Sequence, residues 1–178
     1  MCNPVRMDAK IWFPGIGSRQ EHRITADAVV LHPESRGFLT LRSANPRDTP
    51  RISLNLFSAP ADMATAQRGV ALARAIYRTE PQAHITGREI RPGADINTPE
   101  SLEAYIRANA GVTQHPVGTC SMGVGPNAVV DPRLRVYGIE GLRVADASIM
   151  PTIPGGNTNA AAIMVGEKAS DLILARSA

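Results

Sequence analysis

The fold class is decided by residues 51–78, RISLNLFSAPADMATAQRGVALARAIYR, within which the hydrophobic period changes. Residues 51–54 alternate polar and apolar side chains, as a half-buried strand does. From Ala61 to Arg78 the apolar residues instead recur at helical spacing, at Val70, Ala73, Ile76 and Tyr77. The stretch therefore predicts a strand followed by an amphipathic helix of about five turns, with arginines on its polar side.

The chain upstream of this stretch is rich in strand and turn signals. Residues 9–13, 24–31 and 38–43 have strand-like composition, and residues 33–37 and 45–48 carry the Pro, Gly and Asn of turns. Together with residues 51–54 they predict an antiparallel meander.

The chain downstream alternates helices with a long irregular part. Thr98 followed by Pro99 predicts a capped helix that stops at Gly111. Residues 112–157 are loop-rich, with short strand candidates at 128–130 and 142–145. The last helix is expected over residues 158–176, with its buried side at Ile163, Met164, Leu172 and Ile173.

The sequence thus predicts an α+β chain, in which an antiparallel sheet with flanking helices is followed by a C-terminal segment and helix. We expect two regions, residues 1–110 and 111–178, with the change at the glycine that stops the second helix.

Composition excludes several classes of function. The 178 residues are 43% hydrophobic and carry a net charge of +3, which is scattered rather than gathered in a basic block, so we expect no nucleic-acid partner. The longest apolar run, Ala160 to Val165, is too short for a membrane span, and no signal peptide is evident. Cys2 and Cys120 make neither a disulfide framework nor a metal cluster. These features favour a cytoplasmic protein without a metal site.

One candidate for chemistry is the run of small and flexible residues that follows His115 and ends at Gly123. Pro116 biases His115 toward an extended backbone, and small side chains let the backbone approach a bound molecule closely. A surface loop with an ordinary histidine is the alternative interpretation. A cysteine hydrolase that uses Cys120 and His115 is disfavoured, because the residues around Cys120 do not form a nucleophile elbow.

A second candidate is residues 151–159, PTIPGGNTN, directly before the last predicted helix. Its prolines and glycines predict a sharp approach to a helix start, where free N–H groups and the positive dipole end favour an anion or an electron-rich ring. A plain helix cap by Asn157 or Thr158 is the alternative. Between the two candidates, residues 142–148, LRVADAS, predict a short strand that runs into small residues.

Taken together and in order, residues 115–123, 130–138, 142–148 and 155–159 resemble the C-terminal part of the glucose–methanol–choline (GMC) flavoprotein oxidoreductases, and within them the choline and other alcohol dehydrogenases. The resemblance implies FAD as cofactor and oxidation of an alcohol to an aldehyde, with hydride transfer to flavin N5. It implies that His115 takes or positions the hydroxyl proton and that Asn157 hydrogen-bonds the substrate oxygen. It also implies that Asp146, Ala147, Asn157 and Thr158 lie along the flavin.

One part of the family pattern is missing. Gly15-Ile16-Gly17 lacks the third glycine of the dinucleotide fingerprint, so the phosphate-binding half of an FAD site is not recognisable. The resemblance therefore implies two partners, a small-molecule alcohol and an N-terminal FAD-binding half that this sequence does not carry. A non-catalytic remnant or interaction module of the same fold, without bound FAD, is the alternative.

Overall fold

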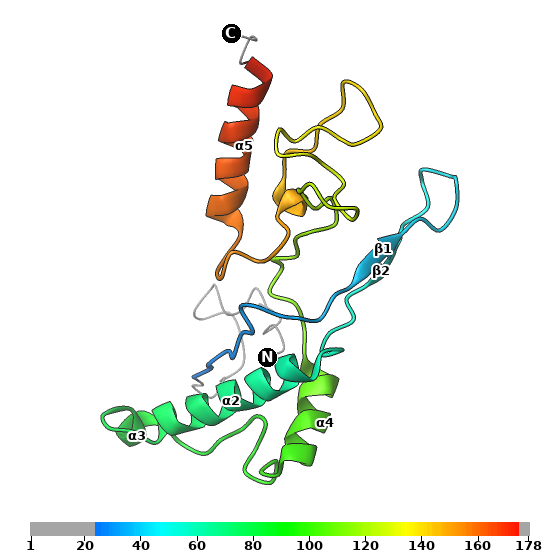
Figure 1. Cartoon of the computed structure of the whole chain (residues 1–178). Coiled ribbons are helices and arrows are strands. Elements are labelled where there is room, and N and C mark those ends of the chain that lie inside the picture. Colours follow the sequence, from blue (N-terminus) through cyan, green and yellow to red (C-terminus); the bar gives the residue numbers. More distant parts are fainter. Residues whose placement is uncertain (1–23, 175–178) are drawn as a thin grey trace, which may run out of the picture. The chain divides into compact units, whose positions relative to one another are not determined.

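The computed structural model describes residues 24–174, which form two compact units (Figure 1). The first unit contains residues 24–36 and 55–111, and the second contains residues 37–54 and 112–174. Helices and a small antiparallel sheet are both present, which confirms the α+β class. The strand predicted at residues 9–13 lies outside the described residues. The assignment of residues 1–110 and 111–178 to two regions of a longer enzyme stays a prediction.

The antiparallel sheet is a hairpin of β1 (Phe38–Thr40) and β2 (Arg51–Ser53), and Phe38 pairs with Ser53. The turn predicted at residues 45–48 is present, with the Asp48 N–H donating to the Asn45 carbonyl at 3.1 Å. Gly37 precedes β1 at a position where a Cβ atom would lie 2.2 Å from the Ser53 carbonyl oxygen, so no larger residue fits. The two predicted strands are confirmed in shortened form.

The strand predicted at residues 24–31 is wrong, because this segment has no regular secondary structure. It packs against helix α2 (Pro60–Tyr77) instead of joining the sheet. Gly69 of α2 leaves room for the Ala28 side chain, whose Cβ would lie 2.8 Å from a Cβ at position 69, and Val30 packs against the core of the first unit. The apolar side chains of an extended segment can be buried against a helix as well as in a sheet.

The core of the first unit forms where α2 meets α4 (Pro99–Asn109), and a short helix, α3 (Gln82–Ile85), follows α2. Its buried residues are Phe57, Met63, Ala66, Leu102 and Ile106. The predicted helix is therefore confirmed over nearly its full length, but Ile76 is 55% exposed and lies off its buried side.

Side-chain hydrogen bonds cap the start of α4 and fasten a loop to α2. The Thr98 hydroxyl accepts from the Ser101 N–H at 3.2 Å, and the Ser101 side chain accepts in return from the Thr98 N–H, which confirms the predicted helix start. On α2, Arg74 donates to the Glu89 carboxylate at 2.9 Å and to the carbonyl of Ile96, fastening the loop that connects α3 to α4.

The core of the second unit gathers around Val130, whose side chain is fully buried. Ile149 of the 3₁₀ turn η1 (Ala147–Ile149) and Val165 and Ala169 of α5 (Asn159–Leu174) pack around it, together with Leu134. The strands predicted at 128–130 and 142–145 are reduced to isolated bridges, because no neighbouring segment runs alongside them for long enough to form a ladder.

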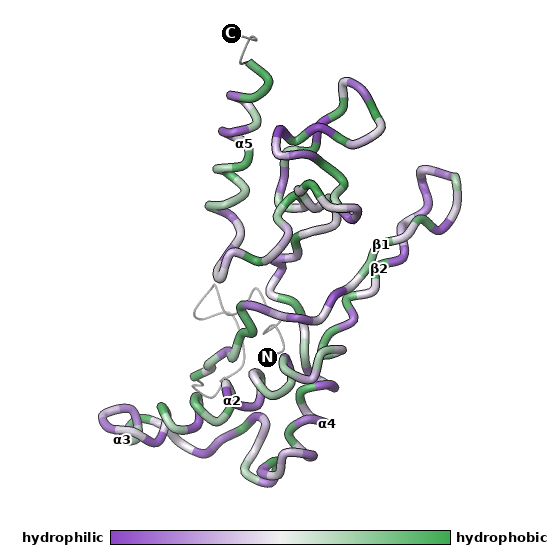
Figure 2. The backbone as a smooth tube through the Cα atoms, viewed as in Figure 1, coloured by the Kyte–Doolittle hydropathy of each residue, from purple (hydrophilic) through white to green (hydrophobic). Residues whose placement is uncertain are grey.

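The last helix is confirmed over residues 159–174, but of its predicted buried residues only Leu172 packs against the core. Ile163, Met164 and Ile173 are each more than half exposed, whereas Val165, Ala169 and the partly buried Leu172 face the core. Apolar residues occur along α5 well beyond its buried side (Figure 2), so periodicity could not choose the side that packs. Within residues 24–174 no helix has the length and apolarity that crossing a membrane requires.

Asp62, in the first turn of α2, is a buried carboxylate that ties two segments of the first unit together. It is 4% exposed and accepts from the N–H groups of Glu34 and Ser35 at 2.8 and 2.9 Å. Burial acts to raise the pKa of Asp62, but hydrogen bonds from the Ser35 side chain and the two N–H groups outweigh it, so the pKa lies below its ordinary value of 3.8.

We expect Asp62→Ala to lower the free energy of unfolding by about 1–3 kcal/mol, because it leaves two N–H donors without their acceptor. Since folding lowers the pKa of Asp62, its contribution is present above pH 3.8 and is lost as the pH falls through the folded-state pKa. Urea unfolding followed by circular dichroism from pH 7 to pH 2.5 measures both effects. Asp95→Ala, at an exposed aspartate, is the matched control, and equal stability of the two variants would contradict the assignment.

Candidate functional site

His115 and Thr158, 43 residues apart in the sequence, meet in the second unit. The His115 Nδ1 atom lies 3.0 Å from the Thr158 hydroxyl oxygen, and the Thr158 N–H donates to the same Nδ1 at 3.4 Å. His115 is half-buried and Thr158 is buried. The structure therefore brings the histidine of the first predicted segment together with the helix start of the second.

The backbone around His115 fixes where its ring lies. Gln114 has a φ of +63°, a left-handed conformation that is uncommon for a residue with a side chain, and Pro116 restricts His115 from the other side. Gly118 has a φ of +90°, and a Cβ at this position would lie 3.4 Å from the Met150 carbonyl oxygen. The small residues predicted to permit close approach do so here toward another segment of the chain itself.

The loop that carries His115 is bonded to the segment that contains η1. The Cys120 N–H donates to the Ser148 carbonyl at 3.0 Å, and the Met122 N–H donates to the Ile149 carbonyl at 2.8 Å. The segment around Val129 is bonded to the same loop, because the Val129 N–H donates to the Ser121 carbonyl at 2.8 Å. The Gly123 N–H also donates to the Val130 carbonyl at 3.0 Å, so backbone hydrogen bonds join the predicted blocks 115–123, 130–138 and 142–148.

Asp146 acts as the cap of η1. Its carboxylate accepts from the Ser148 N–H at 2.7 Å, and hydrogen bonds from the Ser148 side chain and backbone hold the pKa of Asp146 below its ordinary value. Ala147 is the first residue of η1. The carboxylate therefore shapes the chain at this point, and any contact it makes with a bound molecule would be additional.

Asn157 lies one residue before Thr158, at the approach to α5, and its side chain is exposed. The helix begins at Asn159, and the Thr158 carbonyl accepts from the Ala162 N–H at 2.8 Å. The N–H groups of the first helical turn have no acceptor within the helix and form a positive end. Within residues 24–174 no hydrogen bond joins Asn157 or Asp146 to His115, so of the predicted residues only Thr158 is hydrogen-bonded to the histidine.

Asp131 is a residue whose role the sequence reasoning missed. It is 9% exposed and accepts from the N–H groups of Arg133 and Arg135 at 2.8 and 2.9 Å and from the Arg135 side chain at 2.7 Å. The Arg135 N–H is the main cause of a lowered pKa for Asp131, and its guanidinium adds to the effect. An aspartate followed by proline and two nearby arginines was the available signal for such a turn.

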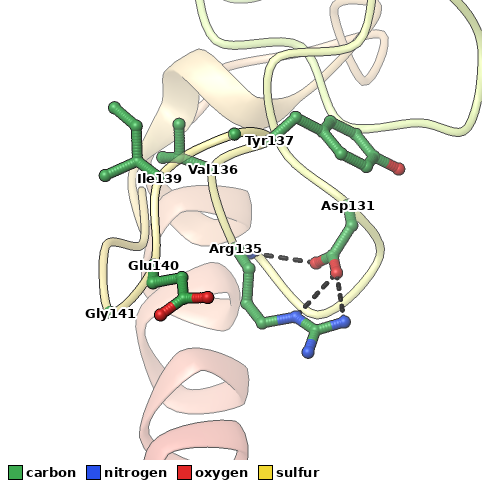
Figure 3. A pocket seen from close by; sticks show the side chains of 8 residues that line it. Asp131, Arg135, Val136, Tyr137, Ile139, Glu140 and Gly141 are labelled. Carbon is green, nitrogen blue, oxygen red and sulfur yellow. Dashed lines mark hydrogen bonds and ion pairs between the residues drawn. The ribbon is translucent and has the colours of Figure 1, made fainter.

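A pocket of about 500 Å³ opens beside this turn and is lined by Asp131 and residues 135–141 (Figure 3). The Arg135 guanidinium points at the Asp131 carboxylate, so the charges of both are already paired. The pocket includes none of the predicted site residues. In the described part of the chain no group of three or more His, Cys, Asp or Glu side chains could hold a metal ion.

Comparison with known proteins identifies the family of the chain. The family model described as GMC oxidoreductase matches residues 33–166. The oxygen-dependent choline dehydrogenase of Brucella ovis is 46% identical over 169 residues, which are 94% of this chain and 31% of that protein. The alcohol dehydrogenase [acceptor] of Pseudomonas putida is 46% identical over 81% of this chain and 26% of its own length.

The chain belongs to the GMC oxidoreductase family. A solved structure, an FAD-dependent oxidoreductase from Chaetomium thermophilum, matches 80% of this chain and 25% of its own with a TM-score of 0.75 at 32% identity. The sequence-based family assignment, to a C-terminal part of these enzymes related to choline and alcohol dehydrogenases, is confirmed. The chain spans about 31% of the length of the choline dehydrogenases that it matches.

The described residues fit one half of a flavin cofactor and not the other. The N–H groups at the start of α5 and the exposed amide of Asn157 are suitable partners for the polar edge of a flavin ring. Among residues 24–174 no strand leads through a glycine-rich turn into a helix, which is the arrangement that binds a dinucleotide pyrophosphate.

The positive φ of Gly118 generates a prediction about the loop that carries His115. We expect Gly118→Ala to lower the stability of the second unit by about 1–2 kcal/mol, because an alanine is strained in a left-handed conformation. Gly125→Ala is the matched control, since a Cβ there meets no atom within 4 Å and the φ is ordinary. Hydrogen exchange of the Cys120 and Met122 amides reports the effect, and equal exchange in both variants would refute it.

Proposed function

We propose that this chain supplies the substrate-binding and proton-handling side of an FAD-dependent site that oxidises an alcohol to an aldehyde. The observation that carries the proposal is the contact of His115 with Thr158, because it joins two sequence blocks in one small site at the start of a helix. Membership of the GMC oxidoreductase family and the similarity to enzymes named for choline and alcohol oxidation support it.

Oxidation of a primary alcohol breaks the O–H bond and one C–H bond of the carbinol carbon. The flavin, when bound, accepts the hydride, that is, the C–H hydrogen with both electrons of the bond. The hydroxyl proton goes to His115, whose Nε2 is the ring nitrogen that Thr158 does not engage. An imidazole nitrogen can accept a proton in general acid–base catalysis, which suits this role.

The remaining predicted residues hold the reactants in place. The exposed amide of Asn157 donates a hydrogen bond to the substrate oxygen and so fixes the hydroxyl near His115. Ala147, Asp146 and the first turn of α5 would hold the ring of the cofactor. The positive end of α5 would favour negative charge on a ring bound there.

The arrangement of residues 24–174 leads to a prediction for the chain by itself. Mixed with excess FAD and then desalted, the chain is expected to retain far less than stoichiometric flavin, because no glycine-rich strand–turn–helix among these residues can cradle the pyrophosphate. Absorbance at the flavin bands measures the retained amount. A stoichiometrically yellow protein would show that the chain binds the whole cofactor alone.

A second prediction concerns an enzyme completed by joining this chain to the FAD-binding portion of the Brucella ovis relative. We expect His115→Ala to lower kcat about 10²- to 10⁴-fold, because it removes the proton acceptor. Asn157→Ala should cost less, about 1–3 kcal/mol of activation free energy, because it removes one neutral hydrogen bond. Steady-state oxidation of choline and of simple primary alcohols, at matched flavin content, provides the measurement.

The exposed histidines His32 and His84 supply the controls, and alanine at either position should leave turnover within a few-fold. A completed enzyme that binds flavin but oxidises no alcohol would favour the non-catalytic alternative. Normal turnover of His115→Ala would show that another residue accepts the proton.

A further inference from the structure

We propose that Thr158 is a positioning residue, which holds the His115 ring by Nδ1 so that Nε2 alone serves the substrate oxygen. This inference rests on the proposed function, since it concerns the ring that is assigned the proton-handling role there. It gives Thr158 a role toward this chain's own histidine, beyond a place along the flavin.

Two different atoms of Thr158 engage Nδ1, and they have different abilities. The backbone N–H can only donate, so its contact at 3.4 Å suits only the tautomer whose Nδ1 is bare and whose Nε2 carries the hydrogen. The hydroxyl, at 3.0 Å, can also accept from a protonated Nδ1. A neutral ring that accepts a proton at Nε2 must carry its own hydrogen on Nδ1, so the Thr158 hydroxyl accepts from Nδ1–H both before and after the proton arrives, and the ring keeps its orientation.

Thr158 is itself firmly placed. It is 8% exposed, and its carbonyl accepts from the Ala162 N–H at 2.8 Å, which anchors it to the first turn of α5. The helix is fixed in turn by Val165 and Ala169, which are 5% and 3% exposed in the core of the second unit. A hydroxyl on so rigid a support fixes its partner with little loss of its own freedom.

His115 is restrained from its own side as well. The left-handed Gln114 and the ring of Pro116 limit the backbone at position 115, and the loop beyond it is bonded to Ser148 and Ile149. The imidazole thus approaches Thr158 from a fixed direction. The ring can still rotate about its side-chain bonds, and the hydrogen bond to Thr158 restricts this rotation.

Substitutions at Thr158 separate the hydroxyl from the shape of the residue. Thr158→Val keeps the branched shape and the N–H but removes the hydroxyl, whereas Thr158→Ser keeps both hydrogen-bonding groups. Thr152→Val, at an exposed threonine of the approach to α5, is the matched control for loss of a hydroxyl.

The first measurement uses the chain itself, labelled with ¹⁵N-histidine, and needs no activity. His115→Gln identifies the His115 ring signals, and the exposed His32 provides a reference for an unrestrained ring. We expect the Nδ1 signal of His115 to differ from that of His32, to move toward it in Thr158→Val, and to stay in place in Thr158→Ser and Thr152→Val. A His115 signal that ignores Thr158→Val while circular dichroism shows a folded chain would overturn the inference.

The second measurement uses the completed enzyme. We expect Thr158→Val to lower kcat about tenfold, the value of one lost hydrogen bond, with flavin content and KM little changed, and Thr158→Ser to restore turnover to within a few-fold. If His115→Ala abolished turnover while Thr158→Val left it normal, the inference would be wrong and the proposed function would stand. If the completed enzyme were inactive, the proposed function would fail, and the ring signals would still decide whether Thr158 positions His115.

Discussion

The second unit depends on two backbone hydrogen bonds, from Cys120 to Ser148 and from Met122 to Ile149. They hold the loop that carries His115 against the segment that contains η1, and they place Ile149 beside Val130 in the core. α5 packs on this core through Val165, and its first turn then lies where Thr158 meets the His115 ring. The site is therefore a consequence of loop pairing, in a unit whose only described strands form one short hairpin.

Aspartate side chains accept backbone hydrogen bonds at several places where no sheet supplies acceptors. Asp62, Asp131 and Asp146 each accept at least one hydrogen bond from a backbone N–H group. Each has a lowered pKa, caused by side-chain and backbone hydrogen bonds together. A carboxylate can satisfy several donors at once, so it can fix a bend where no ladder supplies acceptors. The same device ties residues 34–35 to α2, shapes the turn at 131–135 and starts η1. In each case the carboxylate fixes the path of the backbone at that point.

Large apolar side chains remain exposed in both units. Each unit has its own small core, yet Leu72 on α2 is 62% exposed and Leu174 on α5 is 73% exposed. In monomeric proteins large exposed apolar side chains in number usually mark surfaces that another element covers.

Local signals in the sequence were enough to predict helices α2, α4 and α5, the hairpin and the family. Such signals include the Thr98 cap, the turn at 45–48 and the ordered blocks around His115. The short helix α3 was not predicted. Only the tertiary structure decided which side of α5 is buried, since apolar residues extend beyond one face and the packing of Val130 and Ile149 makes the choice. It likewise decided that residues 24–31 pack on α2 rather than form a strand. The contact between Thr158 and His115 was also beyond the sequence, because a hydrogen bond across 43 residues depends on the path of the chain between them and not on any local pattern.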